Sequence, residues 1–121
     1  MRILIVDDSA TMRKMIRRVF ALVDVQIDEI FEAGNGAEAL DVLERHPVDV
    51  LLTDINMPVM TGTELLREIA SRPQWAHLRR VIISTDGSAA RRDEAAELDV
   101  RWYLEKPFSP EVIRDVLTEV A

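Results

Sequence analysis

The stretch VDVLLTD at residues 48–54 is a short apolar run that ends on a hydroxyl and a carboxylate. Such a run, bounded by polar residues, predicts a strand that is buried on both faces. The runs Ile3–Val6 and Val81–Ile83 have the same character and predict two more buried strands. A more polar run at Ile27–Phe31 indicates a strand nearer an edge, and Trp102–Leu104 makes a fifth.

Stretches with the period of a helix separate the predicted strands. The first places apolar residues on one helical face: Met12, Met15, Ile16, Val19 and Phe20. The last repeats this pattern: Val112, Ile113, Val116, Leu117 and Val120. Helices are also expected around Leu65–Ile69, over Ala37–Arg45 and over Ala89–Leu98. The chain thus alternates strand and helix five times.

Residues that cap helices stand where several of these helices should begin. Thr61 and Glu64 have the spacing of a capping box, in which the two side chains bond free backbone N–H groups of the first turn. Three more helices are expected to begin at Asn35-Gly36, at Ser88, and at Ser109 with Pro110 in the first turn.

The alternation of strands and helices predicts an α/β fold with a parallel sheet, because parallel neighbours need crossover connections. Right-handed crossovers place helices on both faces of the sheet. We expect a doubly wound five-stranded sheet in the order 2-1-3-4-5, formed by residues 1–121 as a single domain. In such a sheet, ligands bind outside the carboxyl ends of strands 1 and 3.

The composition excludes several classes of protein. With 48% hydrophobic and 31% charged residues, the chain is neither a disordered tail nor a membrane protein. The net charge is 15 − 22 = −7, which argues against binding nucleic acid through the overall field. The absence of cysteine excludes disulfides, thiolate zinc sites and cysteine nucleophiles, and suits a reducing cytosol. We therefore expect a soluble protein of the cytoplasm, without a membrane span.

Polar residues follow the predicted strands at the edge where a ligand is expected. Asp7-Asp8 follows the first strand, Asp54 the third, Ser84-Thr85 the fourth and Lys106 the fifth. Each alone is ordinary, since an aspartate after a strand often only caps the next helix. Together, however, two carboxylates ~4 Å apart repel by about 4 kcal/mol at an effective dielectric of ~20, so three need a cation. Oxygen ligands favour Mg²⁺.

With a cation present, one carboxylate is free to act as a nucleophile and form an acyl phosphate. Asp54 is the best candidate because its strand is central. Phosphoryl transfer needs positive charge around the phosphoryl oxygens. Magnesium and Lys106 would supply that charge, and Ser84 one hydrogen bond.

Four motifs in order resemble the receiver domain of two-component response regulators, in particular the stand-alone chemotaxis type with its flavodoxin-like fold. They are Val6-Asp7-Asp8-Ser9, Asp54-Ile55-Asn56-Met57-Pro58 followed by Gly62, Ser84-Thr85, and Lys106-Pro107-Phe108-Ser109. The resemblance implies that Asp54 accepts a phosphoryl group from the phosphohistidine of a sensor histidine kinase or phosphotransfer protein. It also implies that Asp8 and Asp54 bind Mg²⁺ directly, Asn56 through its carbonyl and Asp7 through water.

The resemblance further implies how the signal is carried. Lys106 would contact the phosphoryl group, with a cis peptide before Pro107. Ser84, 30 positions after Asp54, would move toward the phosphate, with Thr85 as the alternative hydroxyl. Tyr103 would turn inward behind it. The output face, roughly residues 88–121, would then contact a downstream protein target, and the chain would act as a monomer.

Two other functions remain open on the sequence. One is a small Mg²⁺-dependent phosphatase with an aspartate nucleophile, although Asn56 stands where a second catalytic acid would be needed. The other is an adaptor domain that has lost phosphorylation.

Two further features of the sequence also have open interpretations. The basic residues Arg13, Lys14, Arg17 and Arg18 form either a solvated helix face or a docking surface. Trp102, not Tyr103, could be the exposed aromatic of the output face.

Overall fold

The computed structural model describes residues 1–120 of the chain. Strands and helices alternate in the predicted order, with one extra 3₁₀ turn: β1 (Arg2–Val6), α1 (Ala10–Phe20), β2 (Glu29–Ala33), α2 (Gly36–Arg45), β3 (Val50–Thr53), α3 (Gly62–Ala70), η1 (Pro73–Trp75), β4 (Arg79–Ser84), α4 (Ala89–Glu97), β5 (Trp102–Glu105) and α5 (Pro110–Val120).

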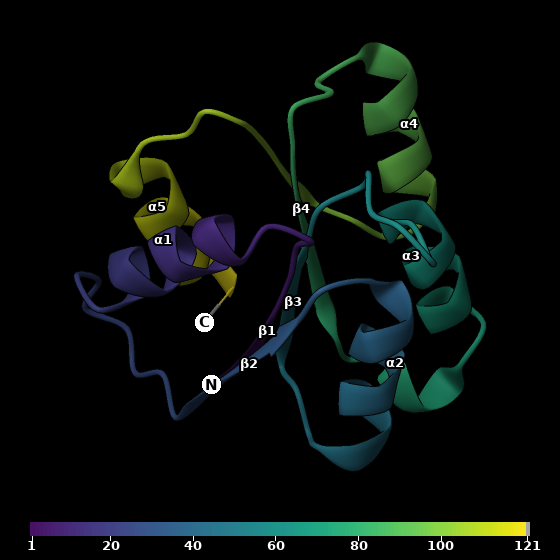
Figure 1. The fold of residues 1–121 in the computed structure, drawn as a ribbon, viewed down its shortest axis with the longest axis horizontal. Helices are drawn as coiled ribbons and strands as arrows, with labels where there is room; N and C mark the ends of the chain where they lie inside the picture. The colour runs from purple at the N-terminus through teal and green to yellow at the C-terminus, as the bar shows by residue number, and fades with distance from the viewer. Residues whose placement is uncertain (121) are drawn as a thin grey trace.

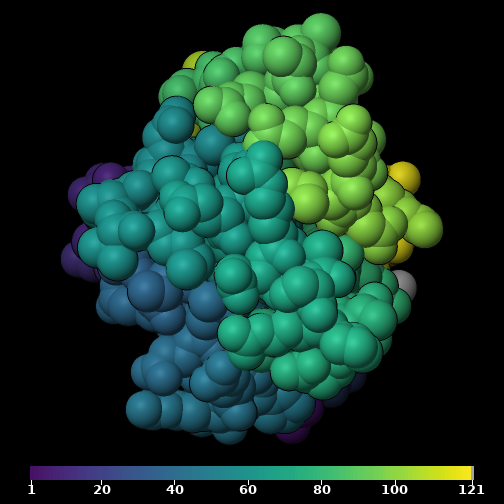
Figure 2. All heavy atoms as spheres, turned by 90° about the vertical axis from the view of Figure 1, so that its right-hand side faces the viewer, coloured from purple at the N-terminus to yellow at the C-terminus, as the bar shows by residue number. Residues whose placement is uncertain are grey.

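The five strands form one parallel sheet in the order β2-β1-β3-β4-β5. Helices α1 and α5 cover one face of the sheet, and α2, α3 and α4 cover the other (Figure 1). Seen from the second face, blue α2, teal α3 and green α4 follow one another from bottom to top (Figure 2). The predicted doubly wound fold is therefore confirmed.

Two hydrophobic layers hold the helices to the sheet. Successive strand residues point to opposite faces, so Leu4 and Leu51 pack in the layer under α2 and α3, while Ile3 and Val50 pack in the layer under α1 and α5. All four side chains are fully buried. Burial on both faces explains why these strands are apolar without alternation.

The strand boundaries differ from those predicted. β2 runs from Glu29 to Ala33, two residues later than Ile27–Phe31, because its ladder with β1 begins only at the Arg2–Glu29 pair. Asp28 precedes it and donates its backbone N–H to the Met1 carbonyl at 2.9 Å. β4 is longer than predicted at both ends, since β3 and β5 together pair with it from Arg79 to Ser84.

Two residues predicted to lie on the buried faces of helices are exposed. Met15 in α1 is 43% exposed and Val112 in α5 is 38% exposed. Successive residues of a helix point about 100° apart around its axis. The next residue in each helix, Ile16 or Ile113, points to the core, so Met15 and Val112 point away from it. The buried face of each helix is narrower than predicted. Each helix packs against the sheet and against the other helix, and its remaining sides face solvent.

The predicted helix caps are largely confirmed. The Thr61 and Glu64 side chains form the capping box of α3, Asn35 accepts the Glu38 N–H, and Ser88 accepts the Arg91 N–H. Pro110 is the first residue of α5. Among residues 1–120, no helix combines the length and the apolar character that crossing a membrane requires.

Candidate functional site

Three carboxylates meet at the carboxyl edge of the sheet. Val6 pairs with Thr53 in the ladder between β1 and β3, so the residues that follow them, Asp7 and Asp54, lie side by side. Asp7, Asp8 and Asp54 each offer an oxygen within 4.8 Å of the others. Asp7 is buried, Asp54 is half-buried and Asp8 is exposed, so one side of the cluster is open to solvent.

Lys106 joins this cluster from the end of β5. Its Nζ lies 2.9 Å from Asp7 Oδ2 and 2.9 Å from Asp54 Oδ2. The Lys106 backbone N–H donates to the Ser84 carbonyl at 2.8 Å, which fixes the root of the side chain against β4. Burial acts to lower the pKa of the Lys106 ammonium, but its hydrogen bonds with the two carboxylates outweigh burial and raise it above the ordinary value. Lys106 therefore carries its positive charge at neutral pH.

Part of the predicted repulsion is relieved by the protein itself. The ammonium of Lys106 lies between two of the three carboxylates, so it supplies part of the compensating charge assigned above to a metal alone. Three carboxylates and one ammonium still leave two negative charges in a site that is open to solvent on one side. An all-oxygen donor set with excess negative charge and an open side fits a hard divalent cation.

The loop after Asp54 folds back against this residue. The Ile55 N–H donates to Asp54 Oδ1 at 2.7 Å, leaving the other oxygen to Lys106. The Gly62 N–H donates to the Ile55 carbonyl at 2.8 Å, and a β-carbon at Gly62 would collide with the Asp54 carbonyl. This close approach explains the glycine at the start of α3. Asn56 is exposed in the same loop, and its part in metal binding stays a prediction.

The two candidate hydroxyls have different surroundings. Ser84 is the last residue of β4 and is fully buried, whereas Thr85 is exposed. The Ser84 Oγ accepts the Asp86 N–H at 3.1 Å, and a serine hydroxyl can donate its own proton while it accepts. The buried position beside the end of β5 favours Ser84 over Thr85 as the hydroxyl of the site.

The two aromatic residues of β5 lie on opposite faces of the sheet. Tyr103 is half-buried on the α4 side, and its hydroxyl donates to the Asp86 carbonyl. Burial, above all, raises the pKa of this hydroxyl. Trp102 packs on the α5 side and donates its Nε1–H to Glu119 at 3.1 Å. Tyr103 is therefore the aromatic next to the Ser84 loop. The peptide between Lys106 and Pro107 is cis, as the resemblance implied.

Sequence reasoning missed the cations that surround the site. Arg13 of α1, treated above only as part of a basic cluster, donates to the Asp7 carbonyl and pairs with Glu32 at 2.9 Å. Arg17 also pairs with Glu32, at 3.3 Å. Two of the four residues of the basic cluster thus share one carboxylate of β2, which offsets one of their two charges. No local pattern could have found these pairs, because they join residues 15 or more positions apart.

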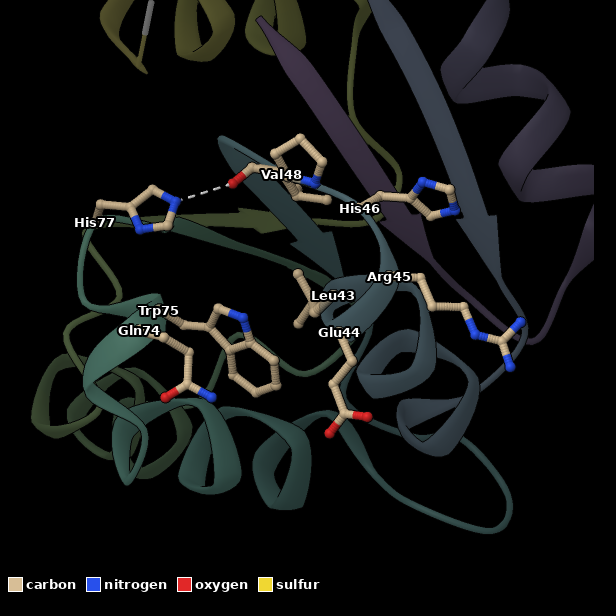
Figure 3. Close-up of a pocket in the computed structure, with 9 residues that line it drawn as sticks. Leu43, Glu44, Arg45, His46, Val48, Gln74, Trp75 and His77 are labelled. Carbon is tan, nitrogen blue, oxygen red and sulfur yellow. Dashed lines mark hydrogen bonds between the residues drawn. The ribbon is translucent and has the colours of Figure 1, made fainter.

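A cavity of about 360 Å³ lies at the opposite, amino edge of the sheet, between α2 and η1. Both histidines of the chain line it, but Figure 3 shows that the His46 ring points away from His77. His46 stacks on Phe31 with ring centroids 4.7 Å apart, and His77 Nε2 lies 3.3 Å from the Val48 carbonyl. Neither histidine contacts a carboxylate among the described residues, so neither has the partner that orients the histidine of a catalytic triad.

Comparison with known proteins agrees with the geometry of the carboxyl edge. The response regulator receiver domain family matches residues 3–118. A chemotaxis protein CheY homolog of Campylobacter jejuni is 36% identical over 121 residues, covering 99% of this chain and 92% of that protein. The chemotaxis protein CheY of Pseudomonas aeruginosa is 36% identical over 120 residues, covering 99% of this chain and 95% of that protein.

Solved structures lead to the same family. Chemotaxis response regulator CheY4 of Vibrio cholerae superposes with a TM-score of 0.87 at 30% identity, covering 99% of this chain and 98% of that one. These likenesses favour neither the phosphatase nor the adaptor considered above. The chain therefore belongs to the response regulator receiver domain family, and it is a signalling switch activated by phosphorylation and not a conventional enzyme.

Proposed function

We propose that Asp54 is the phosphoacceptor of this switch. The observation that supports this is the position of Lys106 Nζ, 2.9 Å from one oxygen of Asp54, inside a cluster of three carboxylates. A carboxylate oxygen of Asp54 attacks the phosphorus of a phosphohistidine on a sensor kinase or phosphotransfer protein. The new O–P bond forms as the N–P bond breaks, and the electron pair of that bond stays on the imidazole nitrogen.

The remaining residues of the cluster prepare this transfer. Mg²⁺, when bound, offsets negative charge on the phosphoryl oxygens. Asp8 and Asp54 would hold the ion directly, Asn56 through its backbone carbonyl and Asp7 through water. Lys106 carries a fixed positive charge that is already directed at Asp54, so it can bind a phosphoryl oxygen without long-range movement. Water later hydrolyses the acyl phosphate, and the same groups assist that step.

Ser84 and Tyr103 are proposed to carry the signal away from Asp54. The Ser84 hydroxyl would leave the Asp86 N–H and donate to the new phosphoryl group, and the ring of Tyr103 would move with the loop of residues 85–88. The output face is α4, β5 and α5, which contacts a downstream protein target. Ala121, part of the face expected from the sequence, lies outside the described residues.

The relatives suggest the setting of this signal. Those from C. jejuni and P. aeruginosa are named chemotaxis proteins. We infer that this chain serves a chemotaxis pathway in the cytoplasm and acts as a monomer. Light scattering with and without a phosphoryl mimic tests the monomer, since a doubled mass would contradict it.

Phosphorylation by a small acyl phosphate tests the assignment of Asp54. Wild-type protein incubated with acetyl phosphate and Mg²⁺ should gain the mass of one phosphoryl group, and Asp54→Asn should gain none. Asp49→Asn is the matched control, because Asp49 lies just before the other end of β3. Undiminished labelling of Asp54→Asn would refute the assignment. Loss of labelling in Mg²⁺-free buffer would support the metal.

The same labelling, combined with a spectroscopic signal from Tyr103, separates the two hydroxyls. Ser84→Ala should retain acceptance of the phosphoryl group but lose the accompanying change at Tyr103. Thr85→Ala should leave both intact, since its side chain is exposed. The opposite result would assign the role to Thr85. An adaptor that has lost phosphorylation would show neither labelling nor saturable Mg²⁺ binding.

A further inference from the structure

An arginine of α4 closes over the tyrosine of the proposed switch. The guanidinium carbon of Arg92 lies 4.6 Å from the centroid of the Tyr103 ring. Its Nη2 lies 2.8 Å from Glu105 Oε1, and its Nε–H donates to the Gly87 carbonyl at 3.2 Å. We propose that Arg92 is a positioning residue that holds Tyr103 and the loop of residues 85–88 in this conformation. This inference rests on the proposed function and names a regulation of that site.

The three partners of Arg92 come from the elements that must move together. Gly87 belongs to the loop between β4 and α4, and Tyr103 and Glu105 belong to β5. Residues two apart on a strand point to the same face, so one guanidinium can cover the ring and reach the carboxylate. A planar guanidinium suits this double contact, with its face on the ring and its edge on the carboxylate.

The inner side of the same loop leads to the phosphorylation site. The Tyr103 hydroxyl donates to the Asp86 carbonyl, and the Asp86 N–H donates to the Ser84 Oγ at 3.1 Å. Contacts therefore run without a break from Ser84 through Asp86 and Tyr103 to Arg92. If Ser84 turns to a phosphoryl group on Asp54, the Asp86 N–H loses its acceptor and the loop must shift. The contacts of Arg92 with Gly87 and Tyr103 oppose that shift.

Gly87, in the loop between β4 and α4, leaves room for the ion pair between Arg92 and Glu105. A β-carbon at Gly87 would collide with the carboxylate of Glu105, so the absence of a side chain lets Glu105 pass beside the loop to Arg92. Helix α4 has few other attachments among the described residues, since only Ala95 of this helix is buried. The contacts of Arg92 thus connect α4 directly to Tyr103 and Glu105 of β5.

The effect of this clamp should be modest, because Arg92 and Glu105 are 44% and 53% exposed. One exposed cation–π contact and one exposed ion pair should together favour the described conformation by about three- to fivefold. A ligand that binds the other conformation must overcome this factor, so its apparent affinity is lowered by the same factor.

The chain offers a specific reporter, because Tyr103 is its one tyrosine. Protein made with fluorotyrosine would give a single ¹⁹F signal from the ring in question. We would titrate beryllofluoride, a phosphoryl mimic, into wild type, Arg92→Gln and Glu105→Gln at fixed Mg²⁺. Arg92→Gln should bind it about three- to fivefold more tightly, with the free ¹⁹F signal moved toward the bound position, and Glu105→Gln, which removes only the ion pair, should show a smaller gain in the same direction. The double variant should add little to Arg92→Gln, because Arg92→Gln already removes the contact with Glu105.

The opposite edge of the molecule provides a matched control. Arg72 lies over the Trp75 ring at 5.0 Å and pairs with Glu44 at 2.9 Å, so it has the same chemistry away from the loop. Arg72→Gln should leave the affinity for beryllofluoride unchanged. If wild type itself shows no response, the proposed function fails. If wild type responds but Arg92→Gln binds equally or more weakly, or if Arg72→Gln shows the same gain, the role of Arg92 is refuted.

Discussion

Helices α3 and α4 lie on the same face of the sheet and are both nine residues long, yet they are anchored differently. Each begins behind a hydroxyl cap, Thr61 or Ser88. Helix α3 buries three large apolar side chains, Leu65, Leu66 and Ile69. Helix α4 has the sequence AARRDEAAE and buries only Ala95. One helix is thus held by the core and the other mainly by polar contacts.

The difference shows how a small domain can combine stability with a moving part. Burial of large apolar side chains is costly to reverse, because each contributes about 1.5–3 kcal/mol. Exposed ion pairs contribute about 1 kcal/mol or less each and can be exchanged. The α4 contacts of this kind include Arg91 with Asp86 at 3.4 Å and Arg92 with Glu105 at 2.8 Å. Helix α4 can therefore shift while α3 maintains the loop after Asp54.

The largest expected difference is in the cost of removing a buried side chain. Leu65→Ala should lower the free energy of unfolding by about 2–5 kcal/mol, because Leu65 is fully buried. The corresponding change in α4, Ala95→Gly, should cost about 1 kcal/mol, mainly through helix propensity. Urea denaturation followed by circular dichroism measures both. Equal losses would mean that α4 is anchored as firmly as α3.

The second-largest difference is expected in the cost of replacing the glycine near the start of each helix. Gly62→Ala should cost about 2–3 kcal/mol, since the new β-carbon would meet the backbone carbonyl of Asp54, which cannot move freely. Gly87→Ala should cost less than about 1 kcal/mol, because the carboxylate of Glu105 can rotate away. The same denaturation experiment ranks them. A larger loss for Gly87→Ala would show that the loop before α4 is rigid.

Hydrogen exchange should separate the two helices without any mutation. Amides of α4 should open with a free energy about 2 kcal/mol or more below that of α3, because few buried contacts resist local unfolding. Amides of α3 around Leu66 should approach the global value, since this side chain is in the core. Exchange followed by NMR measures both helices in one sample. Equal protection would contradict the view of α4 as the moving element.

The smallest effect should come from the ion pair between the two helices. Arg67 Nη2 lies 3.8 Å from Glu94 Oε1, and the Arg67 side chain is 63% exposed. Arg67→Gln should change the free energy of unfolding by less than about 0.5 kcal/mol, and the change should disappear at high salt. A loss above about 1 kcal/mol that persists in salt would reveal a tighter connection between α3 and α4 than the geometry indicates.

The fold and most of the site could be anticipated from local patterns. Apolar runs and helical periods predicted five strands and five helices in the observed order, although β2 begins two residues later than predicted and Met15 is exposed. The rule for parallel sheets predicted that Asp7, Asp8 and Asp54 share one edge, and their oxygens do meet there. These inferences succeeded because each depends on neighbours in the chain or on connection geometry.

Other features depend on contacts between distant residues and could not be anticipated in detail. Lys106 was expected at the site, but its double contact with carboxylates 52 and 99 positions away follows from how β5 pairs beside β4. The clamp of Arg92 over Tyr103 had no local signal at all, because helix α4 carries no apolar stripe to orient it.

The linear pattern of side chains determined three features of this protein: the order of strands and helices, the burial of the strands, and the residues at the strand ends. The pairing of charges was settled only when the sheet and helices packed, since ion pairs and cation–π contacts depend on distances across the fold. A displacement of a few ångströms decides whether a carboxylate faces Lys106 or open solvent. The order of residues along the chain does not specify distances of that size.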